Sequence, residues 1–342
     1  MTKKQRRLSI WISGGLLLAA AALLMAASVF HPWRRSLVDY TLDADQARAD
    51  EAETSIQQIK RPWVIAVQPG HFKIEELPDE LAHRRGDTGA THGYVFEKDI
   101  NRAVAAALIP MIQAAGWQAF LVPATIRPGL RVDAFLSIHV DGGGQSSLRG
   151  WKLSPPWRPS RASIQLADAM RGSFAAESQL REEKGGVTIF MRGYFSFNYR
   201  RYRHAISPFT PAVLVELGRI GNRRDRELLT GHPEYWAGIL LRGLKSYFGD
   251  RDRFLPADLR PMQLPWVIPG PGGVSVRLSP RENAKLLVAT DSATPFFPVD
   301  ESSAWYEVFV RKLRRTGWVL KSEVIATNER RWPWRRAPSP ER

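Results

Sequence analysis

Short blocks that alternate between strand-like and helix-like patterns limit the fold of this chain more than any other feature. Apolar runs at 63–68, 117–122, 134–140 and 211–217 are typical of buried strands, and 187–191 is predicted as a further strand. Residues 97–116, 162–174 and 224–248 place apolar side chains at helical spacing. This alternation predicts an α/β fold, with a mostly parallel twisted sheet covered by helices on both faces.

The composition excludes several classes of protein. The 342 residues carry 49 Lys and Arg against 34 Asp and Glu, a net charge of +15, and 44% are hydrophobic. Enough apolar material is present for a buried core, so a wholly disordered chain is excluded. Because there is no cysteine, disulfides, thiolate metal sites and cysteine nucleophiles are excluded, and any metal must be held by His, Asp or Glu.

The positive charge by itself suits nucleic acid, anionic lipid or an anionic cell-wall polymer. The basic residues are mostly scattered arginines, without a zinc-finger, recognition-helix or RNP-like pattern. We therefore expect no nucleic acid among the partners of this chain.

The N-terminal region predicts a membrane anchor. A basic tail at 1–7 precedes a charge-free run at 8–33, which is long enough to cross a hydrocarbon core of roughly 30 Å as a helix. A cleaved signal peptide is the alternative, since small residues stand at 26–28, but its apolar region is usually shorter. The basic tail favours an N-in orientation. We predict a single-pass membrane protein whose bulk lies on the outer side, periplasmic or extracellular.

Changes in composition predict the remaining domain boundaries. An acidic spacer at 34–61 leads to the α/β domain at 62–250, and a linker at 251–272 follows, whose five prolines are expected to exclude regular elements. Short strand-like runs at 274–278, 285–289, 305–310 and 317–320 predict a small β domain at 273–326. A basic, proline-rich tail occupies 327–342.

Four polar residues stand where a predicted strand ends or a predicted helix begins, namely His71, Glu97, His139 and Glu216. Each alone has an ordinary explanation, such as a turn hydrogen bond for a histidine or the helix dipole for Glu97. The carboxylate inside the apolar run 211–217 is costly unless it is paired or functional. Ligands collect at the carboxyl ends of parallel strands, and two histidines with one glutamate match a catalytic zinc site.

The motifs around these four residues resemble those of the zinc-dependent N-acetylmuramoyl-L-alanine amidases, the Amidase_3 family, which trim bacterial peptidoglycan. In chain order the matching motifs are Pro69-Gly70-His71, Glu97-Lys98-Asp99-Ile100-Asn101, Ser137-Ile138-His139 and the run 211–218, followed by Asn222. The resemblance spans 62–248. It implies that His71, Glu97 and His139 bind Zn²⁺, and that Glu216 is the catalytic acid/base. The bond cut would be the amide between N-acetylmuramic acid and L-alanine, with peptidoglycan as substrate and a protein activator as a possible partner.

The chain departs from the family motifs at three places. Phe72-Lys73 follow the first histidine, Val140-Asp141 follow His139, and Arg219 follows the last motif. None of these changes removes a proposed ligand or the proposed base, so we expect an active enzyme. The changed positions line the predicted site, which suits an amidase that is altered in substrate preference or regulated. The alternatives are a catalytically silent peptidoglycan-binding or regulatory protein on the same fold, which the retained Glu216 disfavours, and a zinc peptidase of the stem peptide.

Two further features bear on binding. The β domain weakly resembles a bacterial SH3-like module, in Val274-Ser275-Val276-Arg277, Trp305-Tyr306-Glu307-Val308 and Gly317-Trp318-Val319, which implies wall binding or simple packing of its Trp residues. Aromatic and basic residues also mingle at 149–161 and 194–203, as in a solvated loop or in a groove wall for a glycan strand. His83 and His92 are not included among the ligands, nor His204 among the substrate contacts.

Overall fold

The computed structural model describes residues 61–327, apart from 143–146, 184, 250 and 292–294. The predicted basic tail, the anchor, nearly all of the spacer and nearly all of the C-terminal tail lie outside the described residues. Within the part described, no helix is both long enough and apolar enough to cross a membrane.

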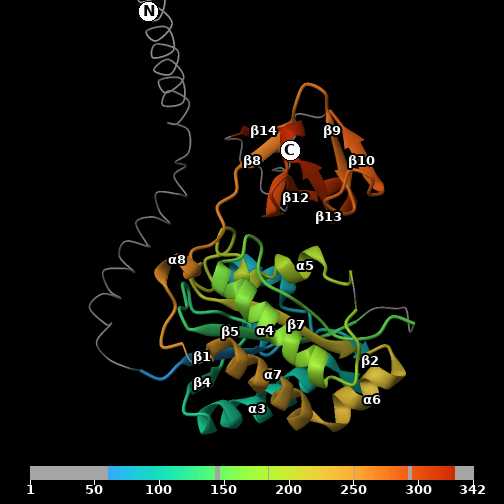
Figure 1. The fold of residues 1–342 in the computed structure, drawn as a ribbon. Helices are drawn as coiled ribbons and strands as arrows, with labels where there is room; N and C mark the ends of the chain where they lie inside the picture. The colour runs from blue at the N-terminus through green and yellow to red at the C-terminus, as the bar shows by residue number, and fades with distance from the viewer. Residues whose placement is uncertain (1–60, 143–146, 184, 250, 292–294, 328–342) are drawn as a thin grey trace, which may run out of the picture. The chain divides into compact units, whose positions relative to one another are not determined.

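A five-stranded sheet of order β4-β1-β5-β7-β6 forms the centre of the α/β domain (Figure 1). Its strands are β1 (Val64–Pro69), β4 (Gln118–Leu121), β5 (Ala134–Asp141), β6 (Lys152–Ser154) and β7 (Ala212–Arg219). Four of them run parallel, and β6 pairs antiparallel with β7 at the edge. The prediction of a mostly parallel sheet is confirmed; the three-residue strand β6 was not expected.

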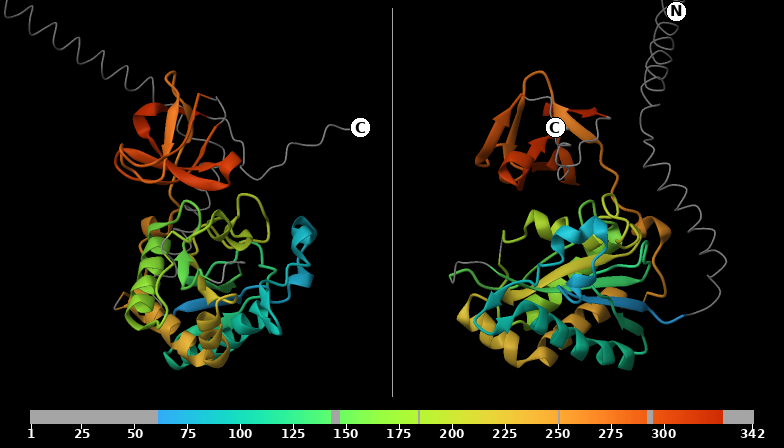
Figure 2. Two further views of the ribbon diagram at one scale, coloured as in Figure 1. Left: turned by 90° about the vertical axis from the view of Figure 1, so that its right-hand side faces the viewer. Right: turned by 180° about the vertical axis from the view of Figure 1, so that it is seen from behind.

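Three long helices form one layer of this domain. They are α3 (Glu97–Ala114), α4 (Arg161–Glu177) and α7 (Pro233–Phe248), and α7 packs against both of the others (Figures 1 and 2). The apolar stripe of α3 contributes Ile100, Val104, Leu108 and Ile112 to the buried core, as its spacing predicts. Since α3 also packs on β1 and β5, the layer covers one face of the sheet.

The other face of the sheet is covered by residues 189–210, which contain no long helix. Met191, Phe197 and Ile206 of this segment pack against Phe135 and Leu214 of the strands. The regular elements on this side are short: α5 (Ile189–Arg192), η4 (Phe195–Phe197), and the 3₁₀ turns η2 (Ile74–Glu76) and η3 (Asp79–Arg84). The expectation of covering helices on both faces is wrong here, because large apolar side chains of an irregular segment fill the space.

Two of the expected elements take a different form. The run 187–191, predicted as a strand, instead leads into the one-turn helix α5, whose start is capped by the Thr188 side chain. The run 224–248, predicted as one helix, is two: α6 (Arg223–Gly231) and α7. The break falls at His232, because Pro233 removes a backbone donor and opens a new helix at its first position.

The prediction that the proline-rich stretch 251–272 holds no regular element is also wrong. It contains α8 (Pro256–Leu259) and β8 (Trp266–Pro269). Pro256 occupies the first turn of its helix, where the missing N–H has no partner to lose, and Pro269 is the last residue of its strand.

Residues 266–327 form the C-terminal β domain. Its five-stranded antiparallel sheet has the order β10-β9-β13-β12-β11, and β8 pairs with β14. The bounds are β9 (Val274–Arg277), β10 (Leu286–Thr290), β11 (Phe297–Glu301), β12 (Trp305–Val310), β13 (Arg315–Leu320) and β14 (Val324–Thr327), with the short turns η5 (Arg311–Leu313) and η6 (Lys321–Glu323). All four strands expected in this region are present.

The C-terminal β domain packs on the α/β domain through α5 and the loop before α4. The Trp157 ring lies 5.5 Å from the rings of both Phe297 and Phe309. Arg192 at the end of α5 makes an ion pair of 2.6 Å with the buried Glu307. The domains therefore share an apolar contact that is bordered by a charged pair.

Candidate active site

His71, Glu97 and His139 meet at one edge of the sheet. One ligand atom from each lies within 4.8 Å of the other two. His71 follows β1 and His139 lies near the end of the adjacent parallel strand β5, so both reach the same edge. Glu97 arrives there as the first residue of α3, after the hairpin of β2 (Thr91–His92) and β3 (Val95–Phe96). The predicted convergence of these three residues is present in the structure.

The separations among these atoms suit a small tetrahedral cation. Glu97 Oε1 lies 3.0 Å from His139 Nδ1 and 3.4 Å from His71 Nε2. Ligands about 2.0–2.1 Å from a tetrahedral zinc ion stand roughly 3.3 Å from each other. In addition, His139 Nε2 is buried and has no hydrogen-bond partner among the described residues. The donor set and the spacing therefore fit a divalent metal such as zinc.

A second layer of contacts holds the three side chains. His71 Nδ1 donates to the carbonyl of Asp87 at 2.6 Å, which leaves the lone pair of Nε2 facing Glu97. The Asn101 amide donates to the Gly70 carbonyl at 3.2 Å and to Glu97 Oε1 at 3.3 Å. Asn101 belongs to the second motif, one helical turn after Glu97, but its role was not predicted. Asp87 accepts the hydrogen bond from His71 with its backbone carbonyl, so its side chain gave no indication of this contact in the sequence.

Two glycines leave room for the cluster. A Cβ on Gly70 would lie 2.4 Å from Cε1 of His139, and one on Gly89 would lie 2.6 Å from Glu97 Oε2. Gly89 also has a φ of +84°, which disfavours any larger residue. His71 itself has a φ of 63°, in the left-handed region that few non-glycine residues adopt. Strained backbone of this kind gathers at functional sites.

The charges of the cluster are coupled. Burial disfavours the Glu97 carboxylate, but hydrogen bonds and charge from His139 and His71 outweigh that effect and hold the pKa of Glu97 well below its ordinary value. Burial likewise lowers the pKa of His71, yet Glu97 and Asp87 more than compensate, so that this pKa is raised. Without a metal, the site therefore favours a negative Glu97 beside a protonated histidine.

Glu216 lies beside this cluster. It is the register partner of His139 on the neighbouring strand, so the two side chains leave the same face of the sheet. Its Oε2 is buried and accepts no hydrogen bond among the described residues. Burial, and then the nearby charges of Glu97 and Asp141, raise the pKa of Glu216 well above the ordinary value. The surroundings of Glu216 therefore favour the protonated carboxyl more than water does.

A network of ion pairs borders Glu216 on the other side. Lys152, the register partner of Glu216 on β6, is only 2% exposed and pairs with Asp141. Arg219 binds Glu183 through two bonds of 2.7 Å and lies 3.1 Å from Asp141. Sequence reasoning identified Asp141 and Arg219 only as departures from the family motifs and did not single out Lys152 or Glu183. Their pairing became visible only in the folded structure.

Tyr194 also contacts the cluster, with its ring 5.1 Å from that of His139 in an edge-to-face arrangement. Burial raises the pKa of its hydroxyl above the ordinary range, so this group stays protonated. The segment 194–203 was interpreted from the sequence as a solvated loop or as a groove wall, and in the structure its first residue reaches the site. Tyr194 was not predicted individually.

The three other histidines considered from the sequence stand apart from the cluster. His83 lies in η3 and His92 in β2, and both are exposed. His204 makes a contact of 2.8 Å between its Nδ1 and Glu80 Oε1. Leaving them out of the ligand set agrees with the one three-residue metal grouping found in the described part of the chain.

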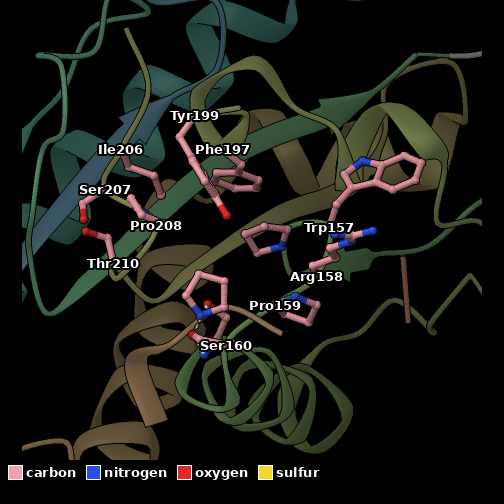
Figure 3. A pocket seen from close by; sticks show the side chains of 13 residues that line it. Trp157, Arg158, Pro159, Ser160, Phe197, Tyr199, Ile206, Ser207, Pro208 and Thr210 are labelled. Atoms are coloured by element: carbon pink, nitrogen blue, oxygen red, sulfur yellow. Dashed lines mark hydrogen bonds between the residues drawn. The ribbon is translucent and has the colours of Figure 1, made fainter. Parts of the chain in front are cut away.

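A separate pocket lies at the amino end of β7 (Figure 3). One wall carries Phe197 and Tyr199 and the other carries residues 156–160. Prolines and aromatic rings dominate its lining, and none of the four predicted site residues is among them. We therefore assign no part of the metal chemistry to this pocket.

Comparison with known families decides which class of protein this arrangement belongs to. Residues 65–236, half of the chain, match the family described as N-acetylmuramoyl-L-alanine amidase, Amidase_3. The chain belongs to this family. The amidase is thus a cell-wall hydrolase, and its activity is cleavage of the amide between N-acetylmuramic acid and L-alanine in peptidoglycan. No curated protein matches the whole sequence significantly.

Solved structures of other amidases are similar to this domain. The CwlD amidase of Clostridioides difficile, solved in complex with the GerS lipoprotein, is 19% identical, with 55% of this chain and 100% of that chain covered and a TM-score of 0.39. The catalytic domain of CwlV from Bacillus (Paenibacillus) polymyxa has the same identity and score, with 55% and 99% covered. Ami1 of Mycobacterium smegmatis is 21% identical, with 56% and 99% covered and a TM-score of 0.40.

Proposed function

We propose that the amidase is zinc-dependent, that His71, Glu97 and His139 hold the ion, and that Glu216 is the catalytic acid/base. The observation that carries this proposal is the meeting of the three ligand atoms within 4.8 Å, beside a carboxyl in register with His139. Two nitrogen donors and one oxygen donor leave a position open, as in catalytic rather than structural zinc sites. When bound, zinc would polarise the scissile carbonyl and make water a stronger nucleophile near neutral pH.

Glu216 would move the proton that hydrolysis requires. As the carboxylate it would accept a proton from the attacking water, and as the acid it would return that proton to the leaving amine of L-alanine. A raised pKa suits this exchange, because both forms are then accessible near neutral pH. Lys152 and Arg219 oppose the rise in pKa, so they would keep the carboxyl from remaining permanently protonated.

The experiment compares the full-length protein, purified in mild detergent, with Glu216→Gln on isolated peptidoglycan. The control is Glu227→Gln on α6, whose side chain is 66% exposed. We expect the wild type and the control to release stem peptides that begin with a free L-alanine amino group, identified by mass. A chelator or Glu216→Gln should abolish this release.

Other outcomes of that experiment distinguish between the alternative functions of the protein. Cleavage inside the stem peptide would identify a peptidase instead. Zinc bound at one ion per chain without any release would indicate a silent wall-binding protein, or an enzyme that needs a protein activator. A chain that binds no zinc would refute the proposed ligand set.

The location of the enzyme is a proposal on different grounds. Residues 8–33 are proposed to anchor the chain in the cell membrane, N-in, with the catalytic domain on the outer side where peptidoglycan lies.

The C-terminal β domain is proposed as an SH3-like module, supported by its small antiparallel sheet and by the motifs in β9, β12 and β13. Pull-down of the isolated domain on purified wall would test its binding.

A further inference from the structure

Two arginine side chains near the metal cluster make no hydrogen bond to any described residue. Arg84 ends η3; its Nε is buried without a partner, and its nearest carboxylate is Asp87, 4.0 Å from Nη1. Arg201 is exposed, and its guanidinium lies over the Tyr202 ring at 5.0 Å. A guanidinium carries five N–H donors, so both groups have binding capacity that the described part of the protein does not use.

Arg84 is connected to the metal ligands along two short routes. Its Cζ lies 5.7 Å from the Phe195 ring, which is 4.5 Å from the ring of Tyr194, the neighbour of His139. On the other route, the residue paired with Arg84 is Asp87, whose carbonyl accepts the hydrogen bond from His71. A ligand at Arg84 would therefore be separated from His71 by Asp87 alone.

The two arginines also lie near each other. Arg84 lies over the Phe195 ring and Arg201 over the Tyr202 ring, and these two rings belong to one buried cluster. Both positive charges also lower the pKa of His83, after the larger effect of burial. They come from different parts of the chain, η3 and the segment 194–203, which pack together through Leu81, Phe195 and Tyr202. Glu80 of η3 accepts hydrogen bonds from the backbone N–H groups of Arg203 and His204, so its carboxylate is used there, and the two guanidinium groups still favour binding of an anion from solution.

The chemistry of the substrate indicates which anion this is. The lactyl carboxyl of N-acetylmuramic acid is the acyl half of the bond to be cut, so it has no charge in the substrate. Free carboxylates are carried instead by the stem peptide, on the leaving side of that bond. A guanidinium stacked on an aromatic ring keeps its edge free for two parallel bonds to a carboxylate.

We propose that Arg84 and Arg201 form a subsite for a carboxylate of the stem peptide, and that this subsite sets the preference of the amidase for acidic stems. The proposal rests on the proposed function, because it assigns the leaving side of the substrate to this edge of the site. It also gives a role to η3, which lies in the long connection between His71 and Glu97.

Two synthetic N-acetylmuramoyl tripeptides test the subsite. They differ only in whether the α-carboxyl of a glutamate at the second position is free or amidated, and all other carboxyls are blocked. Binding is measured by calorimetry on the full-length, zinc-loaded Glu216→Gln protein, which removes turnover. Arg84→Gln and, independently, Arg201→Gln should weaken binding of the free acid about tenfold and leave the amidated form unchanged.

Arg203→Gln is the matched control, because Arg203 is an exposed arginine of the same segment that is not part of the proposed subsite. It should leave both affinities unchanged. Three results would each contradict the proposed subsite. The arginine variants could lose affinity equally for both peptides, or lose affinity for neither, or the Glu216→Gln protein could fail to bind the free acid at all. Selective binding of the acid by a protein that never cleaves it would support the subsite and refute the proposed function, so the two failures are distinguishable.

Discussion

Asp141 and Arg219 form an ion pair of 3.1 Å between Oδ2 and Nη2, across the ends of β5 and β7. Both stand where this chain departs from the family motifs, and they compensate each other. Asp141 alone would place another negative charge near Glu216, whose pKa it already raises. Arg219 opposes that effect, so the two departures are best understood as a single change that keeps the charges around Glu216 balanced.

Removing one charge from this network is expected to destabilise the fold. Arg219→Gln would remove both 2.7 Å bonds to the partly buried Glu183 and would leave Asp141 paired with Lys152 alone, at a cost of roughly 2–3 kcal/mol in the free energy of unfolding. Denaturant unfolding should show a lower midpoint with an unchanged m-value. Arg223→Gln, whose side chain is 86% exposed, is the control and should stay within about 0.5 kcal/mol of the wild type. Equal midpoints for the two variants would contradict this account.

Gly70→Ala should abolish metal binding while the fold survives. The new Cβ would lie 2.4 Å from the His139 ring, which must rotate or shift away from Glu97. We expect the zinc content per chain to fall to near zero, with the circular dichroism spectrum retained. Gly172→Ala in α4 meets no atom within 4 Å and should keep its zinc. Full zinc content in Gly70→Ala would mean that the ring position matters less than its contacts indicate.

The pH dependence of stability should reverse when zinc binds. In the metal-free protein the pKa of His71 is raised above 6.5. The contribution of His71 to the free energy of unfolding is therefore complete below pH 6.5, and it is lost as the pH rises through the raised pKa. Zinc needs the neutral imidazole, so stabilisation by zinc grows over the same interval. The pKa of Glu97 is lowered, so its own contribution is fully present above pH 4.5 and does not change in this window.

Thermal melts at pH 6 and pH 8, with chelator or with zinc, would check this reversal. The metal-free wild type should lose stability towards pH 8 relative to His71→Asn, which lacks the titrating group. The zinc-loaded wild type should gain. Parallel changes in both forms would show that His71 does not control the titration.

The contact between the two domains should be energetically coupled. Arg192 and Glu307 pair at 2.6 Å, and the Glu307 side chain is 7% exposed. A double-mutant cycle with Arg192→Gln and Glu307→Gln should give a coupling of about 1–2 kcal/mol. The pair Lys321 and Glu301, with side chains 30% and 38% exposed, should give less than about 1 kcal/mol. A larger coupling for the exposed pair would be inconsistent with burial as the cause.

The cluster of His71, Glu97, His139 and Glu216 was predictable because its residues stand at positions that the sheet itself defines. Buried parallel strands are seen in the sequence as apolar runs, so a histidine or carboxylate within the last residues of such a run, or just after it, marks the edge of the sheet. His71, His139 and Glu216 were found in this way, and Glu97 from the start of the following helix. The metal grouping that resulted agrees with this reasoning.

The surroundings of the cluster were less predictable. The hydrogen bond to His71 comes from the carbonyl of Asp87, and every residue has a carbonyl. Lys152 lies on a three-residue strand, too short for a period-two pattern to stand out. The four-residue helix α5 lies in an apolar run typical of a buried strand. Its form depends on the Thr188 cap and on its contacts with the sheet and with the C-terminal β domain.

The packing of Trp157 on Phe297 and Phe309 limits how this chain can be recombined. Here the β domain covers apolar surface of its neighbour, and α5, which carries Arg192, leads two residues later to Tyr194 beside His139. Exchange of the C-terminal β domain for another module would therefore require Trp157 and α5 to be redesigned together with it. The two domains should accordingly be inherited as a pair.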